Sequence, residues 1–129
     1  MRSTFRNFAP EKNYITDKML KTTIHEEGNL LIMTFEGKLD SAASFQTERD
    51  MKVLFDSTDH DYLLDMNQLR YVASSGLRLF LQLLKHARSH GRKVEVTGLS
   101  EFMQRVFDET GFTRLFSIVH SQGSSSSNA

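Results

Sequence analysis

Segments with strand-like and helix-like patterns alternate along most of this 129-residue chain. Short apolar or alternating runs favour strands, whereas apolar residues spaced by three and four positions favour amphipathic helices. In chain order these segments predict the arrangement β-β-α-β-α-β-α-β. Such alternation indicates an α/β fold with helices packed on a mostly parallel sheet, which the opening hairpin makes mixed. We therefore expect a single domain with a mixed four- to five-stranded sheet.

The predicted strands are short. The first two flank a turn at Gly28-Asn29, because glycine and asparagine tolerate the backbone angles of tight turns. The five predicted strands span residues 21–27, 30–37, 62–66, 93–99 and 112–119.

Three helices are predicted between the strands, over residues 40–55, 74–91 and 100–111. Asp40 and Ser100 are suited to cap the first and third helices, since their side-chain oxygens can accept a hydrogen bond from a free N–H group. Gly91 and Gly111 are suited to end the second and third helices. Apolar residues recur at helical spacing in the first helix, namely Phe45, Met51, Leu54 and Phe55.

The second helix has the strongest amphipathic pattern. Leu79 and Leu83 widen its apolar face along one flank, and we expect Leu83 to pack in the core and Leu79 to be the more exposed. The central face consists of Leu77, Phe80, Leu81, Leu84 and Ala87.

Composition limits the function classes. The chain has no cysteine, which excludes disulfides, thiolate catalysis and cysteine-bound zinc. Sixteen basic residues balance sixteen acidic ones, so the chain lacks the basic excess typical of proteins that bind nucleic acid or anionic membranes. No apolar run approaches the roughly 20 residues that cross a bilayer, and the N-terminus has no secretory signal pattern. We expect a cytoplasmic protein that binds neither nucleic acid nor membrane.

Enzyme motifs are missing from the chain, which has no G-x-S-x-G, Walker A or G-x-G-x-x-G pattern. His86 and His90 share one helix face, but no third metal ligand is suggested, and the helix dipole favours histidines in a last turn. A cluster of carboxylates fits no calcium loop, namely Asp56, Asp59, Asp61 and Asp65. The first three lie in a polar loop and are expected to be solvated, whereas Asp65 is suited to cap the connector that follows its strand. We expect no enzyme activity, metal or cofactor.

Two adjacent hydroxyls, Ser74 and Ser75, stand at the predicted start of the second helix. One of them can cap the helix, since a helix start leaves four N–H groups unpaired, and a cap contributes about 1 kcal/mol. The same N–H groups and the positive end of the helix dipole can also hold an anion. A phosphoryl group on Ser74 would place about 1.5 to 2 negative charges there. The residue types alone leave both interpretations open.

Four ordered segments resemble the STAS domain family, and within it the bacterial anti-sigma factor antagonists. Residues 30–44 (LLIMTFEGKLDSAAS) are similar to the family's strand that ends in Gly-x-Leu-Asp. Residues 61–91 are similar to its strand, connector, Ser-Ser-Gly-Leu motif and long helix. Residues 92–100 resemble the next strand and turn, and residues 102–119 the final helix, glycine and strand. The resemblance covers about residues 21–119 and implies a STAS-like fold.

We therefore divide the chain into three parts. Residues 1–18 are a polar N-terminal extension, residues 19–120 are the STAS domain, and residues 121–129 are a low-complexity, disordered tail.

The resemblance implies a partner switch. The family's phosphorylated serine lies two residues before the glycine, which corresponds to Ser74 ahead of Gly76. In the family, an anti-sigma factor serine kinase modifies this serine with ATP, and the resemblance implies the same at Ser74. The unmodified antagonist binds that kinase and so frees a sigma factor for transcription, and a serine phosphatase acting on phospho-Ser74 resets the switch.

The same resemblance implies a set of partner-binding residues. Asp40 matches a family aspartate near the phosphorylation site. Many relatives have aspartate where this chain has Ala73, a departure that bears on the efficiency of phosphorylation and on the choice of partner. The expected partner-binding residues are Asp40, Ala73, Ser74, Ser75, Gly76, Arg78, Leu79 and Gln82.

Two other functions are open to test. The chain could serve as a constitutive subunit of a lipid-transport or signalling complex in which Ser74 is never phosphorylated. It could also be an enzyme with Ser74 as nucleophile, which requires a base within hydrogen-bond reach that the sequence does not suggest.

Overall fold

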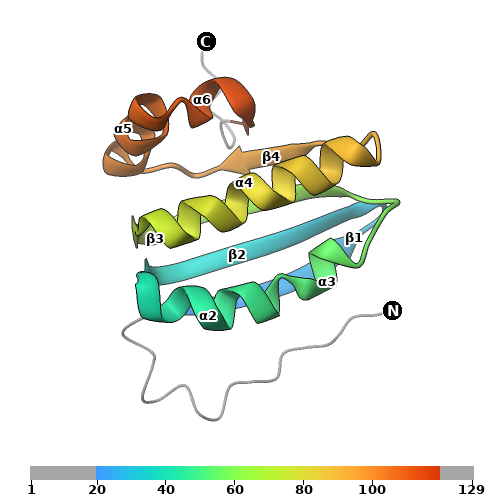
Figure 1. The fold of residues 1–129 in the computed structure, drawn as a ribbon, viewed down its shortest axis with the longest axis horizontal. Coiled ribbons are helices and arrows are strands. Elements are labelled where there is room, and N and C mark those ends of the chain that lie inside the picture. The colour runs from blue at the N-terminus through green and yellow to red at the C-terminus, as the bar shows by residue number, and fades with distance from the viewer. Residues whose placement is uncertain (1–19, 120–129) are drawn as a thin grey trace.

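The computed structural model describes residues 20–119, drawn in colour in Figure 1. The polar extension predicted over residues 1–18 and the tail predicted over residues 121–129 lie outside the described residues.

Five strands form one sheet in the order β1-β2-β3-β4-β5. β1 and β2 are antiparallel and the later neighbours are parallel, which confirms the predicted mixed sheet. Gly28 turns the β1–β2 hairpin with φ of 62°, an angle that glycine adopts at little steric cost. The strands are β1 (Leu20–Glu27), β2 (Leu30–Leu39), β3 (Asp61–Val72), β4 (Val94–Thr97) and β5 (Ser117–Val119).

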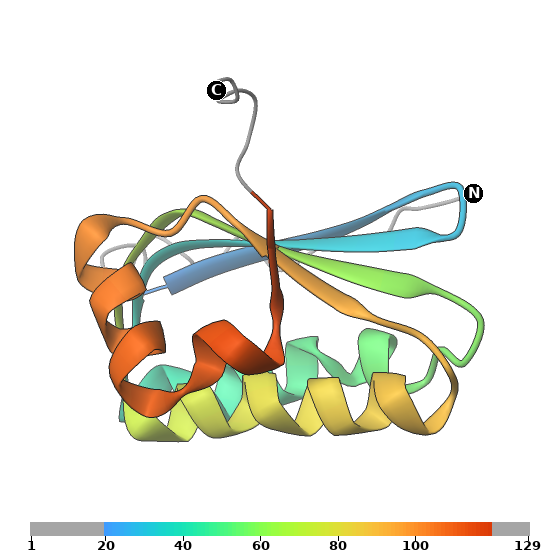
Figure 2. The ribbon, with the colours of Figure 1, turned by 90° about the horizontal axis from the view of Figure 1, so that it is seen from above.

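The helices of the described chain are α2 (Ser41–Asp50), α3 (Lys52–Phe55), α4 (Ser74–Ser89), α5 (Glu101–Thr110) and α6 (Phe112–Leu115). In Figure 2, α2, α3, α4 and α6 lie on one face of the sheet, and α5 stands beside the end of the strands. Within residues 20–119, no helix is both long enough and apolar enough to cross a bilayer.

The core fills the space between the sheet and these helices. Phe35 of β2 and Phe80 of α4 meet edge to face with ring centroids 5.5 Å apart. Such aromatic pairs contribute about 0.5–1.5 kcal/mol beyond the area that they bury. Their fully buried neighbours include Met33, Leu64, Met66 and Leu83.

Several predicted element boundaries differ from those observed, among them those of the first helix and the third strand. The helix predicted over residues 40–55 is two helices that meet at the fully buried Met51. The strand predicted over residues 62–66 runs on to Val72, because β2 offers it a parallel partner as far as the Leu39–Val72 pair. Hydrogen bonding to β2 and the burial of Leu69 and Val72 thus extend β3 through the residues predicted to form a connector.

The strand predicted over residues 112–119 is wrong in its first half, which forms α6 before β5 begins at Ser117. Gly111 ends α5 with φ of 85°, as its predicted role as a helix stop requires. The helical turn that follows places Phe112 and Phe116 four residues apart on one side, where both pack against Phe107. In an extended strand, two residues four positions apart would lie too far from one another for both rings to pack against Phe107.

The apolar face of α4 is centred differently from the prediction. Leu79 is 5% exposed and Leu83 is fully buried, so both belong to the core. Leu77 and Leu81, which were predicted to be central, are half-buried at the margin of the face. The expectation that Leu79 is exposed is therefore wrong.

Candidate functional site

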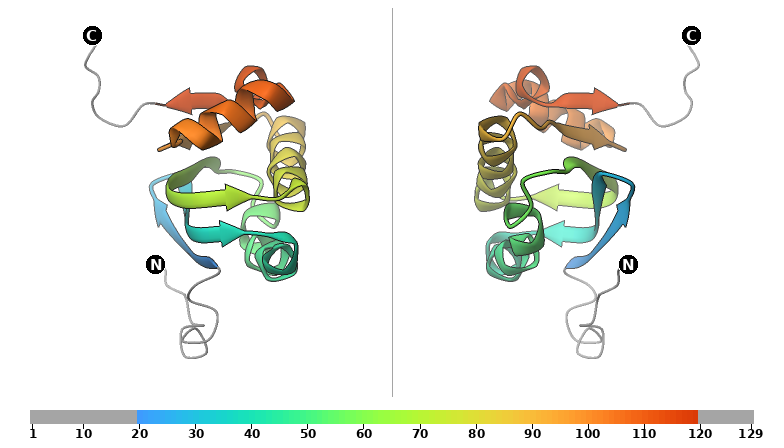
Figure 3. Two further views of the ribbon diagram at one scale, coloured as in Figure 1. Left: turned by 90° about the vertical axis from the view of Figure 1, so that its left-hand side faces the viewer. Right: turned by 90° about the vertical axis from the view of Figure 1, so that its right-hand side faces the viewer.

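The candidate site lies where two parallel strands end side by side. Leu39 of β2 pairs with Val72 of β3, so the next residues, Asp40 and Ala73, leave the sheet together. The Ala73 N–H donates to the Leu39 carbonyl at 2.8 Å. α2 and α4 therefore begin next to one another on the same face of the sheet (Figure 3).

Asp40 caps α2, as the sequence predicts. Its Oδ1 accepts a hydrogen bond from the Ala43 N–H at 2.8 Å. Its carbonyl accepts one from the Ser44 hydroxyl at 3.0 Å. The half-buried carboxylate is thus occupied by its own helix, and contact with a partner stays a prediction for Asp40.

Ser75 connects the two helices. Its Oγ lies 2.7 Å from the Oγ of Ser44, which is 8% exposed. A hydroxyl has one hydrogen, and that of Ser44 goes to the Asp40 carbonyl, so Ser75 is the donor of this bond. Ser75 therefore has a structural role at the contact between α2 and α4.

Ser74 is free of such contacts. It is the exposed first residue of α4, and within residues 20–119 its hydroxyl has no hydrogen-bond partner. The N-cap position is held by Ala73, which has no side-chain oxygen to offer the helix. The interpretation that one of the two serines caps α4 is therefore wrong, and the first N–H groups of α4 have no side-chain cap.

Gly76 has a packing role. A Cβ atom at this position would lie 2.7 Å from Cγ of Leu39 and 2.8 Å from Cγ2 of Val72. Real Cβ contacts are essentially never that short, so glycine lets the first turn of α4 lie directly on the ends of β2 and β3. Gly76 is buried, so a partner cannot contact it directly unless α4 moves.

The remaining predicted site residues are exposed, half-buried or buried according to their position around α4. Arg78 and Gln82 are exposed and follow Ser74 at intervals of four residues, so the three share one side of the helix. Leu79 points into the core, and its predicted contact with a partner is wrong because only 5% of it is exposed. Ala73 and Ser75 are half-buried.

Phe45 is an exposed residue that sequence reasoning placed on the apolar face of its helix. The structure exposes 74% of it. Phe45 and Met51 are six positions apart, which at about 100° per residue puts them on well-separated sides of a helix. Angular position around the helix could have separated them, whereas a count of apolar spacings did not.

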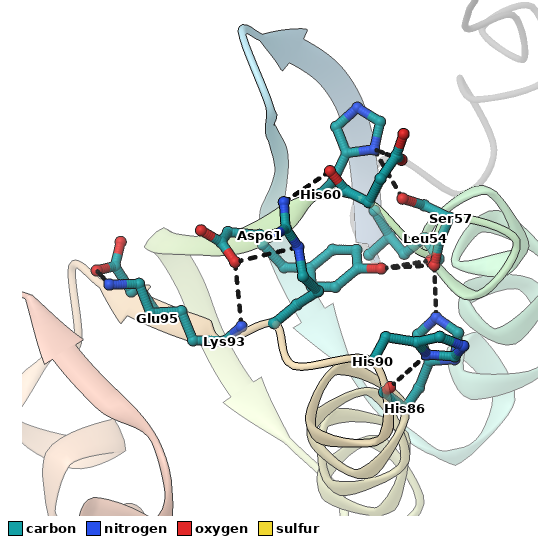
Figure 4. A network of polar contacts seen from close by, with 11 residues as sticks. Leu54, Ser57, His60, Asp61, His86, His90, Lys93 and Glu95 are labelled. Carbon is teal, nitrogen blue, oxygen red and sulfur yellow. Dashed lines mark hydrogen bonds and ion pairs between the residues drawn. The ribbon is translucent and has the colours of Figure 1, made fainter.

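His60, Asp61, His86 and His90 lie near the start of β3, at the end of that strand away from Ser74 (Figure 4). His60 contacts Ser57 Oγ and Glu26 Oε2, each at 2.7 Å. These contacts connect the loop before β3 to the edge strand β1. Asp65 accepts from the Asn67 N–H at 3.0 Å, the local capping role that the sequence predicts for it.

His86 fixes the same loop from α4. Its Nε2 lies 2.7 Å from the carbonyl oxygen of Ser57, which also accepts from the Tyr62 hydroxyl at 2.9 Å. Burial raises the pKa of Tyr62, although its hydrogen bond at Ser57 acts in the opposite direction. Among residues 20–119, no three histidine or acidic side chains are placed to share a metal ion. This network stabilises a loop.

Comparison with known proteins places the fold in a family. The STAS domain matches residues 21–124. BtrV of Bordetella bronchiseptica, assigned as an anti-sigma factor antagonist, is 27% identical over 103 residues, which are 80% of this chain and 89% of BtrV.

Solved structures share the fold at low sequence identity. An anti-sigma factor antagonist from Mycobacterium paratuberculosis superposes with a TM-score of 0.71 at 13% identity, covering 78% of this chain and 86% of that one. The phosphorylated form of the Bacillus cell fate determinant SpoIIAA superposes with a TM-score of 0.62 at 16% identity, covering 77% of this chain and 91% of SpoIIAA. The family match covers most of the chain and agrees with the mixed sheet and its one-sided layer of helices, so the chain belongs to the STAS domain family.

Proposed function

We propose that this protein is an anti-sigma factor antagonist whose binding to an anti-sigma factor serine kinase is switched by phosphorylation of Ser74. Unmodified, it binds the kinase and frees a sigma factor to direct transcription. The kinase transfers a phosphoryl group from ATP to Ser74, after which the complex separates. A serine phosphatase removes the group and restores binding.

The observation that carries this proposal is the difference between the two adjacent serines. Ser75 is held in the contact with Ser44, whereas the Ser74 hydroxyl is exposed. The family membership and the name of BtrV support the role of an anti-sigma factor antagonist, and the phosphorylated form of SpoIIAA supports control by phosphorylation.

The start of α4 is suited to a phosphoryl group. No side chain caps the helix and no acidic residue lies in its first turn. The N–H groups there can donate to phosphate oxygens, and the helix dipole favours the negative charge. The domain can therefore accept the modification without refolding, while a partner that packs over the hydroxyl meets about 1.5 to 2 new charges.

The test is phosphorylation in vitro by each anti-sigma factor serine kinase of the source organism, followed by peptide mass spectrometry. We expect one kinase to bind the unmodified protein, to add a single phosphate to Ser74 and then to release it. Ser41 is a matched control, because it is the exposed first residue of the neighbouring helix α2, which Asp40 caps. Phosphate on Ser41, or none with any kinase, would contradict the proposal, and a stable complex without phosphate would indicate a constitutive subunit.

A further inference from the structure

Phe45 is the most exposed large apolar side chain of the described domain, at 74%. It follows Ser44, whose hydroxyl contacts Ser75 beside the proposed phosphorylation site. A phenylalanine so exposed has an unfavourable contact with water that a partner would relieve. Aromatic residues and arginine are the residue types enriched in the energetically dominant parts of protein interfaces.

The exposed charges on the neighbouring helices α2 and α4 are mainly basic. We define the α2–α4 surface by seven exposed residues of these two helices, namely Phe45, Glu48, Arg49, Ser74, Arg78, Gln82 and Lys85. It carries three basic side chains and one acidic one, whereas residues 20–119 as a whole carry twelve basic and fourteen acidic residues. Among those described residues, no ion pair occupies Arg49, Arg78 or Lys85.

We infer that the kinase binds this α2–α4 surface, with Phe45 as its apolar anchor and Arg78 as its charged anchor. The inference rests on the proposed function and names the chemistry of the partner. The kinase presents an apolar pocket for the phenyl ring and carboxylates opposite Arg78. Complementary charge favours this occupant over a second copy of the chain, since two copies would face one another with like charge.

The same geometry explains how phosphorylation ends binding. Ser74 and Arg78 are four residues apart on α4, with the phosphorylated residue on the N-terminal side. This is the favourable order for an acid–base pair on a helix. The phosphate of Ser74 pairs with Arg78, which removes the charged anchor from the partner's carboxylates and places negative charge against them.

Binding titrations with the kinase that phosphorylates the wild type test the surface. We expect Phe45→Ala to weaken binding about 30-fold and Arg78→Glu to weaken it at least about 10-fold. Val53→Ala is the matched apolar control, since Val53 is 47% exposed on α3. Lys21→Glu is the matched charge control on the exposed strand β1, and both controls should bind within about 3-fold of the wild type.

Each result has a separate meaning. If the kinase binds the wild type, Phe45→Ala and Arg78→Glu with the same affinity, the proposed surface is overturned and the proposed function stands. A loss in only one variant would overturn the anchor assigned to the other residue. If no kinase binds or modifies the wild type, the proposed function fails and the surface falls with it. Sedimentation that shows a dimer abolished by Phe45→Ala would overturn the choice of the kinase as occupant.

The pairing of phosphate with Arg78 can be tested without the kinase. Phosphoserine is incorporated at position 74, and the second ionisation of the phosphate, with a pKa near about 6, is followed by phosphorus NMR. A nearby arginine favours the doubly charged phosphate, so Arg78→Gln should raise this pKa, whereas the Lys21→Gln control should leave it unchanged. Equal values with and without Arg78 would overturn the pairing.

Discussion

The hydroxyl oxygens of Ser44 and Ser75 lie 2.7 Å apart and join the first turns of α2 and α4. Ser44 also donates to the Asp40 carbonyl, so a chain of hydrogen bonds runs from the start of α4 to the cap of α2. This relationship gives the two adjacent serines of α4 different roles. Ser75 fixes the helix in place, and Ser74 is left at the surface.

Removing the Ser75 hydroxyl should lower the stability of the domain and leave phosphorylation of Ser74 unchanged. We expect Ser75→Ala to lower the free energy of unfolding by about 0.5–1.5 kcal/mol, the usual net value of one hydrogen bond. Denaturant unfolding measures this, and Ser41→Ala is the control at an exposed position. The double variant with Ser44→Ala should cost less than the two single changes together, and full additivity would show that the contact has no energetic weight.

A charged residue at position 74 should imitate the phosphorylated state. We expect Ser74→Glu to weaken kinase binding at least about 10-fold because it places a negative charge at the centre of the surface. The fold should persist, since an acidic side chain at a helix start is stabilising by about 0.3–1 kcal/mol. Ser74→Ala should bind and resist phosphorylation. Titration calorimetry and circular dichroism report the two properties, and equal affinity of Ser74→Glu and Ser74→Ala would argue against Ser74 as the switch.

Any side chain at position 76 should disturb the packing of α4 on the sheet. A Cβ there would lie within 2.8 Å of both Leu39 and Val72, so these side chains or the helix must move. We expect Gly76→Ala to lower the free energy of unfolding by about 1–3 kcal/mol, as overpacking of a core does. Gly91→Ala is an informative contrast, because its Cβ would meet nothing within 4 Å and only its φ of 70° opposes the change. A Gly76→Ala variant as stable as the wild type would show that the helix shifts at no cost.

The alanine at the N-cap of α4 leaves room for a stabilising change. Ala73 has φ of −86° and ψ of 167°, the extended geometry of a capping residue. Ala73→Asp should therefore cap the helix and raise the free energy of unfolding by about 1 kcal/mol, as measured by thermal or denaturant unfolding. Its carboxylate would then compete with phosphate for the same N–H groups. We expect slower phosphorylation of Ser74 in this variant by the cognate kinase, and a faster rate would show that the kinase reads the aspartate directly.

Asp108 links α5 to α6 and should titrate abnormally. Hydrogen bonds from the Thr113 hydroxyl and then from the Gln104 amide lower the pKa of Asp108 below its ordinary value of 3.8. A carboxyl group with a lowered pKa stabilises the fold above pH 3.8, and this contribution is lost as the pH falls through the lowered value. Thr113→Val should move the pKa of Asp108 upward, which carbon NMR of the carboxyl group can measure.

Thr110→Val is the matched control for that titration. The Thr110 hydroxyl donates to the Val106 carbonyl at 2.8 Å, so its loss should leave the pKa of Asp108 unchanged. Equal shifts in the two variants would indicate a general disturbance of the α5–α6 turn.

Local rules predicted those features that depend on neighbours in the chain. The alternation of strands and helices, the turn at Gly28, the caps at Asp40 and Ser100 and the stop at Gly111 all follow from short-range chemistry. The Ser-Ser-Gly motif at the start of α4 could be located in the same way, since a helix start requires only the residues around it.

Long-range contacts decided what the local pattern could not. Residues 67–72 were predicted to form a connector yet continue β3, because β2 supplies a strand to pair with. Three packed phenylalanines turn the first half of the last predicted strand into α6. Leu79 and Phe45 exchanged their expected environments, because burial depends on which side of a helix meets the sheet.

The sequence by itself determined the order of elements, the family resemblance and the position of Ser74 at a helix start, because each is a property of consecutive residues. Only the tertiary structure decided that Ser75 and not Ser74 is engaged, since its partner Ser44 lies 31 residues away. The exposure of Phe45 on α2, next to the helix that carries Ser74 and Arg78, likewise required the packed helices. Which hydroxyl a kinase can reach, and which side chains surround it, follow from how two parallel strands end together.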